Sequence, residues 1–356
     1  MGVEEEFLLA GALSPALAAA GDAVVAEAEV GSDGQFEHEF KREQAELGTS
    51  PQESMSDLAN DLVRRRVELA EAAQRRGVRV LASATSPLDE HATSTAGDRY
   101  ERMTSLFGRI ARIQLTCGMH VHVAVESPAE GVAVLDRIRG WLAVLLALST
   151  NSPFLAGQDT DYASYRTVLW GQWPTSGVVD PFGGEEGYER ARAALISSGA
   201  AMDDGMIYFD ARLSARYPTV EIRVADVCVD PHDAVVIAAL ARALVSTAAQ
   251  EWADGRHVVP VRSELLRAAT WRAARWGVEE DLVEVRTAEV LPAWDLIGRL
   301  VDWVTPSLER YGDSERVAAG LAEIQRRGTG ARVQRRAYAA NGFVGVADAV
   351  TVPTRT

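Results

Sequence analysis

Three consecutive glutamates begin a hydrophobic segment near the start of the chain, in the sequence G-V-E-E-E-F-L-L of residues 2–9. Side chains alternate between the two faces of a β-strand, so Glu4 and Glu6 share one face while Glu5 takes the other. The apolar run indicates a strand covered on both faces, where two ionised carboxylates need a cation. Oxygen ligands suit Mg²⁺ or Mn²⁺. We therefore expect Glu4 and Glu6 to face a metal and Glu5 to tolerate replacement, with a solvent-facing pair on an edge strand as the alternative.

More glutamates follow in E-H-E-F-K-R-E-Q-A-E-L, within residues 36–47, which we expect to form a second strand. The acids are Glu37, Glu39, Glu43 and Glu46. Taken alone, the segment is typical of a solvated polar face with a surface histidine between two acids. As part of a carboxylate-lined cavity, the same residues would be further ligands for a hard cation.

Two histidines at alternate positions, His120 and His122, lie in the apolar segment G-M-H-V-H-V. Their spacing puts both imidazoles on one face of a strand expected over residues 113–125. They are either satisfied core histidines or contacts to a metal or a phosphate. The same spacing occurs in zinc hydrolases, but no H-E-x-x-H motif or neighbouring cysteine supplies the remaining ligands.

An acid and a base alternate in the β-branched stretch T-V-E-I-R-V-A-D, where Glu221 and Arg223 share one face. A simple ion pair explains this spacing, but the planar guanidinium of arginine also suits a carboxylate or a phosphate. The basic segment of residues 326–336 is typical of a helix end followed by a solvated helix, with a nucleotide-phosphate contact as the alternative. Neither a P-loop motif nor a well-placed G-x-G-x-x-G occurs.

The elements that must position these residues alternate irregularly between strand and helix. Helices are expected over residues 55–76, with Ser54 or Ser56 as the cap and Gly77 at the end, and over residues 98–112, 131–149 and 185–198. Further strands are expected over residues 78–84, 206–210 and 219–227, and a long aromatic-rich loop over residues 157–187. The pattern predicts an α+β protein with helices packed on one face of a mainly antiparallel sheet, in a single domain of residues 1–356.

Composition limits the classes of function. The chain has 356 residues, of which 47% are hydrophobic, and a formal net charge of −15, which argues against nucleic acid as a partner. Cys117 and Cys228 are expected to be reduced core thiols. No signal peptide is visible, and the apolar run of residues 141–148 is too short to span a membrane. We therefore expect a cytoplasmic protein with no membrane partner.

In their order along residues 2–230, these motifs, together with Y-x-x-Y-R in the aromatic loop, resemble those of the carboxylate–amine ligase family, also called glutamate–cysteine ligase type 2. The resemblance implies a glutamine-synthetase-like fold, in which a curved, largely antiparallel sheet lines a cavity for ATP and Mg²⁺, or Mn²⁺. It also implies roles for residues. The metal ligands would be Glu4, Glu6, Glu39, Glu46, His120 and Glu221, and ATP would contact Arg166, Arg223 and His120.

The family chemistry implies that ATP phosphorylates a carboxylate, expected to be glutamate, and that an amine, cysteine or another, attacks the acyl phosphate. Arg223 is expected near the transferred phosphoryl group, and Arg166 near the acid substrate or the phosphates. Related ligases differ at the position of His122, so the resemblance gives it no role. Two other readings stay open: a metal-dependent hydrolase using His120 and His122, and a non-catalytic nucleotide-binding relative. A homo-oligomer is compatible with the sequence.

Overall fold

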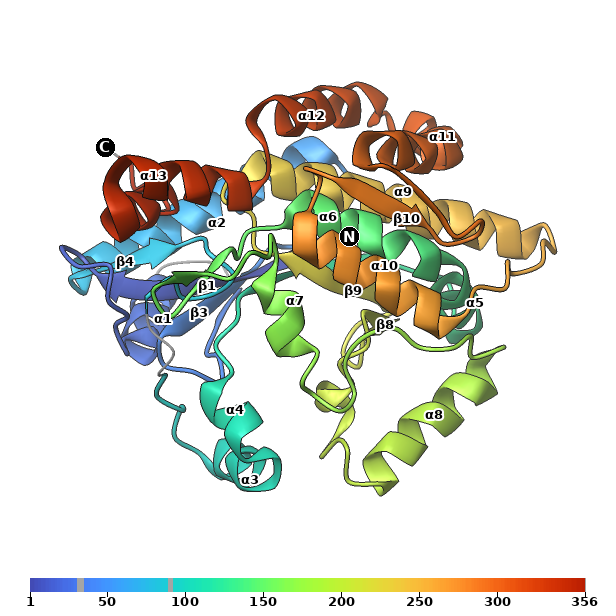
Figure 1. Cartoon of the computed structure of the whole chain (residues 1–356). Helices are drawn as coiled ribbons and strands as arrows, with labels where there is room; N and C mark the ends of the chain where they lie inside the picture. Colours follow the sequence, from blue (N-terminus) through green and yellow to red (C-terminus); the bar gives the residue numbers. More distant parts are fainter. Residues whose placement is uncertain (31–34, 89–91, 356) are drawn as a thin grey trace.

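A sheet of seven antiparallel strands forms the centre of the computed structural model, which describes residues 1–30, 35–88 and 92–355 (Figure 1). Along the sheet, the order of the described strands is β2 (Gln35–Glu37), β3 (Gln44–Gly48), β1 (Gly2–Gly11), β5 (Gly118–Ala124), β9 (Thr219–Asp226) and β8 (Ala211–Leu213); β4 (Val78–Leu81) also pairs with β1. The first strand of the chain is therefore central. Its position explains why Phe7, Leu8 and Leu9 are fully buried.

Long helices cover one face of this sheet. The helices α2 (Met55–Arg75), α6 (Leu142–Ser149) and α9 (Pro231–Ala253) pack on it, and α11 (Ala293–Tyr311) and α12 (Ser314–Arg327) pack on α9 (Figure 1). The Ser54 hydroxyl caps α2 by accepting hydrogen bonds from two backbone N–H groups, and Gly77 ends it at a φ of 72°. By length and composition α9 could cross a membrane, but most of it is buried inside this molecule, as in a core helix.

Smaller elements project from the opposite face. The helices α3 (Asp98–Phe107) and α4 (Arg109–Ile113) form one arm, α8 (Glu185–Ser197) forms another, and α7 (Tyr165–Trp170) lies between them (Figure 1). The remaining elements are α1 (Gly21–Glu29), α5 (Pro128–Ile138), β6 (Phe154–Leu155), β7 (Gln158–Asp159), α10 (Ser263–Trp276), β10 (Asp281–Glu284), β11 (Glu289–Pro292), α13 (Gly330–Ala349) and the short 3₁₀ turns Arg139–Trp141 and Asp204–Met206.

Several expected elements have different bounds. Residues 36–47 form two strands, because the backbone between them leaves the sheet to bond the segment of residues 93–95: Arg42 N donates to Thr93 O at 2.9 Å and Thr95 N to Phe40 O at 2.9 Å. The expected strand over residues 206–210 begins in a 3₁₀ turn, and the sheet pairing starts at Ala211. The expected helix over residues 131–149 is α5 and α6 with a 3₁₀ turn between them, and the aromatic loop contains α7.

The position of Glu5 contradicts the prediction that this residue tolerates replacement. It points away from Glu4 and Glu6, as expected, but it is fully buried against α2. There Arg66 donates from Nε to Oε2 of Glu5 at 2.7 Å and from Nη2 to Oε1 at 2.5 Å. Removing one partner of a buried ion pair typically costs about 3–5 kcal/mol. Cys117 and Cys228 are both buried and free, as expected.

Candidate functional site

A cavity of about 280 Å³ opens on the face of the sheet that carries Glu4 and Glu6. We call it the acidic cavity because carboxylates dominate its floor. The charged and histidine side chains that line it are Glu4, Glu6, Glu37, Glu39, Glu46, His120, His122, Arg212, Arg216, Glu221 and Arg223. All six residues that the sequence suggested as metal ligands are among them.

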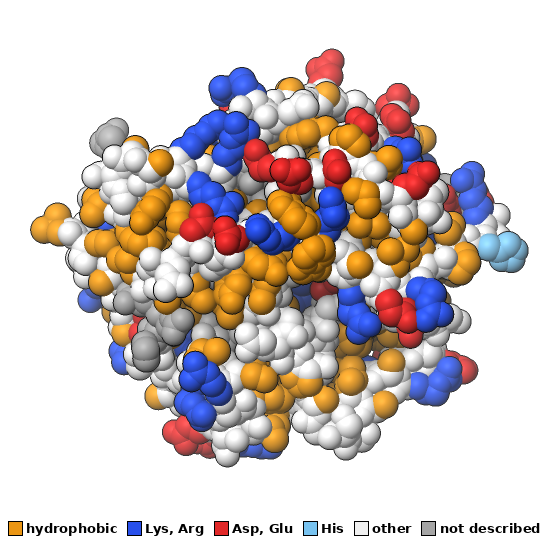
Figure 2. Space-filling view, viewed as in Figure 1, with side chains coloured by type: hydrophobic (Ala, Val, Ile, Leu, Met, Phe, Trp, Pro, Cys, Tyr) orange, Lys and Arg blue, Asp and Glu red, His pale blue; other side chains and the backbone are white. Residues whose placement is uncertain are grey.

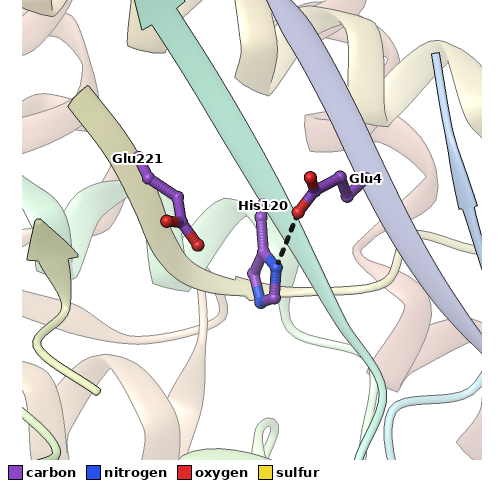
Figure 3. Close-up of side chains that lie close together, drawn as sticks. All are labelled: Glu4, His120 and Glu221. Atoms are coloured by element: carbon purple, nitrogen blue, oxygen red, sulfur yellow. Dashed lines mark ion pairs between the residues drawn. The ribbon is translucent and has the colours of Figure 1, made fainter. Parts of the chain in front are cut away.

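Three of the six form the first ligand group: Glu4, His120 and Glu221 (Figure 3). One ligand atom from each lies within 4.8 Å of the other two. Glu4 on β1 is paired with His120 on β5, and His120 Nδ1 is 3.4 Å from Glu4 Oε2. The register between β5 and β9 then shifts at this histidine, where the third member comes from β9. Two carboxylates and one imidazole at these separations suit a divalent cation.

The second ligand group is Glu6, Glu39 and Glu46, whose ligand atoms also lie within 4.8 Å of one another. Glu6 and Glu46 are direct partners across β1 and β3, while Glu39 comes from the segment between β2 and β3. The break in the expected strand over residues 36–47 therefore shapes this group. Gly118 N donates to Glu6 Oε2 at 2.7 Å, which fixes one carboxylate against the floor. An all-carboxylate set of this kind fits Mg²⁺ or Mn²⁺.

Two arginines compensate the first group. Arg212 donates to both oxygens of Glu221, from Nε at 2.8 Å and from Nη2 at 3.1 Å, and Arg223 Nη1 donates to Oε1. Burial opposes the ionisation of Glu221, but the charges of Arg223 and Arg212 hold its pKa well below the usual range. Burial, together with Arg223, lowers the pKa of His120 to about 4. Its imidazole is then neutral near pH 7, the form that binds metals.

Two histidines stabilise the ionised form of Glu4, as the two arginines do for Glu221. Burial again opposes ionisation, but hydrogen bonds with His120 and His122 hold the pKa of Glu4 well below the usual range. His122 Nε2 lies 3.3 Å from Glu4 Oε2, and its Nδ1 lies 3.0 Å from Thr219 Oγ1. His122 therefore orients Glu4 from outside the first ligand group.

The second group lacks such compensation. Burial and the charge of Glu39 raise the pKa of Glu6 to about 7, and Arg166 lowers it only in part. Burial, with the hydrogen bond and charge of Glu39, raises the pKa of Glu46 well above its usual range. Burial beside a neighbouring carboxylate therefore favours the protonated forms of Glu6 and Glu46 unless another positive charge is present. A divalent cation would supply that charge.

Arg166 approaches the floor from α7. Its Nη2 donates to Arg223 O at 3.2 Å, and its Nη1 lies 4.0 Å from the buried carboxylate of Asp226. Gly118 leaves room for the guanidinium, because a Cβ atom at this position would lie 2.4 Å from Arg166 Nη2. Arg166 thus lies behind the acidic cavity, next to Glu6, and does not line it.

The sequence reasoning missed several lining residues. Arg212 carries no sequence signal, because its strand has only three residues and its partnership with Glu221 depends on strand register. Tyr208 also lines the cavity without a signal in the sequence, whereas Trp170 and Trp173, which line it too, belong to the aromatic loop of residues 157–187. Glu43 lies outside the lining and accepts a hydrogen bond from Thr93 N at 2.8 Å.

The basic segment of residues 326–336 also lies outside the lining of the acidic cavity. It ends α12 and begins α13, as expected of a helix end followed by a second helix. Its arginines pair with acids elsewhere on the protein: Arg327 with Asp233 at 2.5 Å and Arg335 with Asp159 at 2.7 Å.

Comparisons with known proteins identify relatives of this chain. A model of glutamate–cysteine ligase family 2 matches residues 1–347. A protein of Frankia alni with the provisional name glutamate–cysteine ligase 2-2 is 49% identical, over all of this chain and 97% of its own length. A protein of Streptomyces coelicolor, provisionally named glutamate–cysteine ligase 2, is 46% identical over 96% of this chain and 95% of its own.

Solved structures share the fold at low identity. The glutamate–cysteine ligase of Francisella tularensis, in complex with AMP, superposes with a TM-score of 0.68 at 13% identity, over 98% of this chain and 86% of its own. A bifunctional glutathione synthetase from Pasteurella multocida gives a TM-score of 0.65 at 16% identity, over 98% of this chain and 51% of its own. The predicted α+β fold, with its largely antiparallel sheet, is confirmed.

Proposed function

The chain belongs to glutamate–cysteine ligase family 2, and from this premise we propose that it joins an amino-acid carboxylate to an amine at the expense of ATP. One observation carries the proposal beyond family membership. Two groups of side chains whose separations suit a cation, and whose charge balance differs, lie on the floor of one cavity, with Arg223 beside the first. This arrangement suits a polyphosphate that must be held by metal ions and arginine together.

The proposed reaction has two steps. In the first, a carboxylate oxygen attacks the γ-phosphorus of ATP, and the bond to ADP breaks as an acyl phosphate forms. In the second, the lone pair of a neutral amine attacks the acyl carbon, the C–O bond to phosphate breaks, and the amine proton leaves with the phosphate. Phosphoryl transfer of this kind is mainly a matter of positioning and charge stabilisation.

The residues of the chain divide these tasks. Arg223 is 93% buried and would donate hydrogen bonds to the oxygens of the transferred phosphoryl group. Arg166 would orient the acid substrate or the phosphates from behind the floor. Glu4, His120 and Glu221, and separately Glu6, Glu39 and Glu46, would hold Mg²⁺ or Mn²⁺, which when bound neutralises phosphate charge. Trp170 and Trp173 would limit the access of water to the acyl phosphate.

We also propose the identity of the substrates and the setting in which the protein works. The names of the relatives support glutamate as the acid and cysteine or another amine as the acceptor. The net charge of −15 supports a function without nucleic acid. We also propose that residues 1–356 form one catalytic domain that works in the cytoplasm without a membrane partner. The large central core, to which segments from β1 to α12 contribute, supports this unity.

The experiment is a screen of ADP formation by the purified chain, with ATP and Mg²⁺, against amino acids paired with amines. The expected result is ADP and amide in equal amounts, with the amide identified by mass spectrometry. Arg223→Lys should lower turnover by about 100-fold, because it removes a planar two-donor contact, while the affinity for ATP changes little. The exposed Arg310→Lys is the matched control. ADP formation that needs neither acid nor amine would overturn the proposal.

A further inference from the structure

A second cavity, of about 410 Å³, adjoins the acidic cavity. Trp170 and Arg223 line both, so the two cavities meet at these side chains. The second cavity lies between α7 and α10, and none of the proposed metal ligands lines it. Figure 2 shows that hydrophobic side chains gather on this face around α7 and α10, with charged side chains between them.

Charged groups of both signs line the second cavity, and one side-chain atom of each of three of them lacks a hydrogen-bond partner among the described residues. Arg166 is 3% exposed and Arg223 7% exposed, yet the Nε atom of each is buried without a hydrogen-bond partner among the described residues. Oδ2 of Asp210, which also lines the cavity, is likewise a buried atom without a hydrogen-bond partner among the described residues. Buried polar atoms are nearly always hydrogen-bonded, so these atoms indicate a ligand. Because both signs of charge occur, that ligand carries an anionic and a cationic group.

The outer part of the cavity is aromatic. Tyr162, Trp170 and Trp271 line it, and Trp271 Nε1 donates to the hydroxyl of Tyr162 at 3.2 Å. Leu146 adds a buried aliphatic surface. Such walls favour an apolar body and also tolerate an ammonium group near their ring faces. Trp271 is 48% exposed, so it lies at the rim, where the cavity opens to solvent.

We propose that the second cavity binds the amine substrate, and that this substrate is an α-amino acid with a large apolar or aromatic side chain. Asp210 accepts hydrogen bonds from its ammonium group, and Arg166, which lines this cavity and not the acidic one, donates to its carboxylate in place of a contact with the acid or the phosphates. The side chain lies between Trp170 and Trp271. Cysteine would leave much of this volume unfilled, since cavities of roughly 300 Å³ and above hold ligands of drug size.

Two other occupants fit less well. The adenine base of ATP carries no positive charge for Asp210. An acidic amino acid brings a second carboxylate, for which the exposed Arg267 is a partner, but it leaves the aromatic walls without an apolar group to cover. The amino acid with an apolar side chain satisfies the unpartnered groups and the walls together. Its role as amine rests on the proposed ligase function, whereas its binding does not.

Isothermal titration calorimetry of the full chain with L-phenylalanine, L-cysteine, L-glutamate and ADP tests the proposal. Phenylalanine should bind at least about tenfold more tightly than cysteine, because it buries more apolar surface. Asp210→Asn should weaken phenylalanine binding about tenfold and leave ADP binding unchanged. The matched control is Asp302→Asn, at an exposed carboxylate on α11. If Asp210→Asn instead weakens ADP or glutamate binding, the cavity serves that ligand and the proposal is overturned.

A second variant tests ligand binding in the second cavity independently of folding and of amide formation. Trp271→Ala removes an exposed ring, and it should reduce the preference for phenylalanine over cysteine to within about threefold. Binding of phenylalanine that depends on Asp210 and Trp271, without any amide product, would support the cavity while the ligase function fails. Amide formation from phenylalanine that neither variant affects would support the ligase and overturn the cavity.

Discussion

The two ligand groups of the acidic cavity lie side by side on one sheet, yet they balance their charges differently. In the first group, Glu221 has Arg212 and Arg223, and Glu4 has two histidines. In the second group, Glu6 and Glu46 face mainly other carboxylates. The protein itself therefore keeps the two carboxylates of the first group ionised near neutral pH, while the second group needs a positive charge from outside the protein.

This difference suggests a division of labour. A carboxylate that is already paired with arginines can hold a cation next to an anionic phosphate, because arginine is also a good donor to phosphate. Carboxylates without such partners bind a cation strongly and release protons as they do so. We expect metal binding at the second group to change mainly the free energy of unfolding. Metal binding at the first group should change mainly the turnover.

The largest expected effect is that of Glu221→Gln. The change removes a proposed ligand and leaves Arg212 and Arg223 without their common carboxylate. Amide formation should fall by about 100-fold or more, and the free energy of unfolding should fall by about 3 kcal/mol. Steady-state kinetics and urea denaturation measure the two effects, with circular dichroism as the check on the fold. Unchanged turnover would remove Glu221 from the reaction.

The pH dependence of stability should have opposite signs in the two groups. The pKa of Glu6 is raised to about 7, so its contribution to stability is fully present below its ordinary pKa of 4.5 and is lost as the pH rises to about 7. With a chelator present, this loss should amount to about 3 kcal/mol, and Mg²⁺ should reduce it. The depressed pKa values of Glu4 and Glu221 act the other way: their contribution is present above pH 4.5 and is lost as the pH falls further. Urea denaturation at several pH values, with and without Mg²⁺, measures both.

Arg212→Met should make the first group resemble the second. Glu221 would keep only Arg223 as a cationic partner, so its pKa should rise and the free energy of unfolding should fall by about 2 kcal/mol. The same change should make the stability of the protein more dependent on Mg²⁺. Arg216→Met is the comparison, because Arg216 lines the same cavity but is largely exposed. Equal effects of the two substitutions would mean that the pairing with Glu221 is unimportant.

The smallest expected effect has the opposite sign. Glu46→Gln removes one of three crowded carboxylates, and it should raise the free energy of unfolding of the metal-free protein by about 1 kcal/mol. The stabilisation by Mg²⁺ should shrink at the same time. Thermal unfolding with a chelator, and then with Mg²⁺, measures both effects. A destabilised metal-free variant would show that the second group is balanced in a way that the contacts do not reveal.

The sequence predicted which residues line the acidic cavity better than how these residues group. Alternation along a strand put Glu4 with Glu6 and Glu221 with Arg223, and the structure has both pairs on the cavity face. Yet Glu4 and Glu6 belong to different ligand groups, because each group is completed from neighbouring strands. Those partnerships depend on strand order and register, which a single sequence does not contain.

The errors have a common physical origin. Glu5 was expected to tolerate replacement. Alternation along a strand predicts which face a side chain takes, but it does not predict which residues the side chain contacts there. Its partner Arg66 is 61 residues away on α2. Arg212 was missed for a similar reason, since its pairing with Glu221 is made by a short strand that periodicity does not reveal. Long-range ion pairs remain invisible to reasoning from spacing.

The close approach of Gly118 and Arg166 has a consequence for mutational tolerance. The atom that a new Cβ would displace is the end of a long side chain, so the chain can fold around an alanine here by moving the guanidinium. We expect the Gly118→Ala protein to be soluble and to bind metal through its unchanged carboxylates. Its Arg166 would nevertheless be displaced. A random library screened for expression would keep this variant, whereas one screened for turnover would discard it. We therefore expect Gly118→Ala to lower turnover more than it lowers the free energy of unfolding.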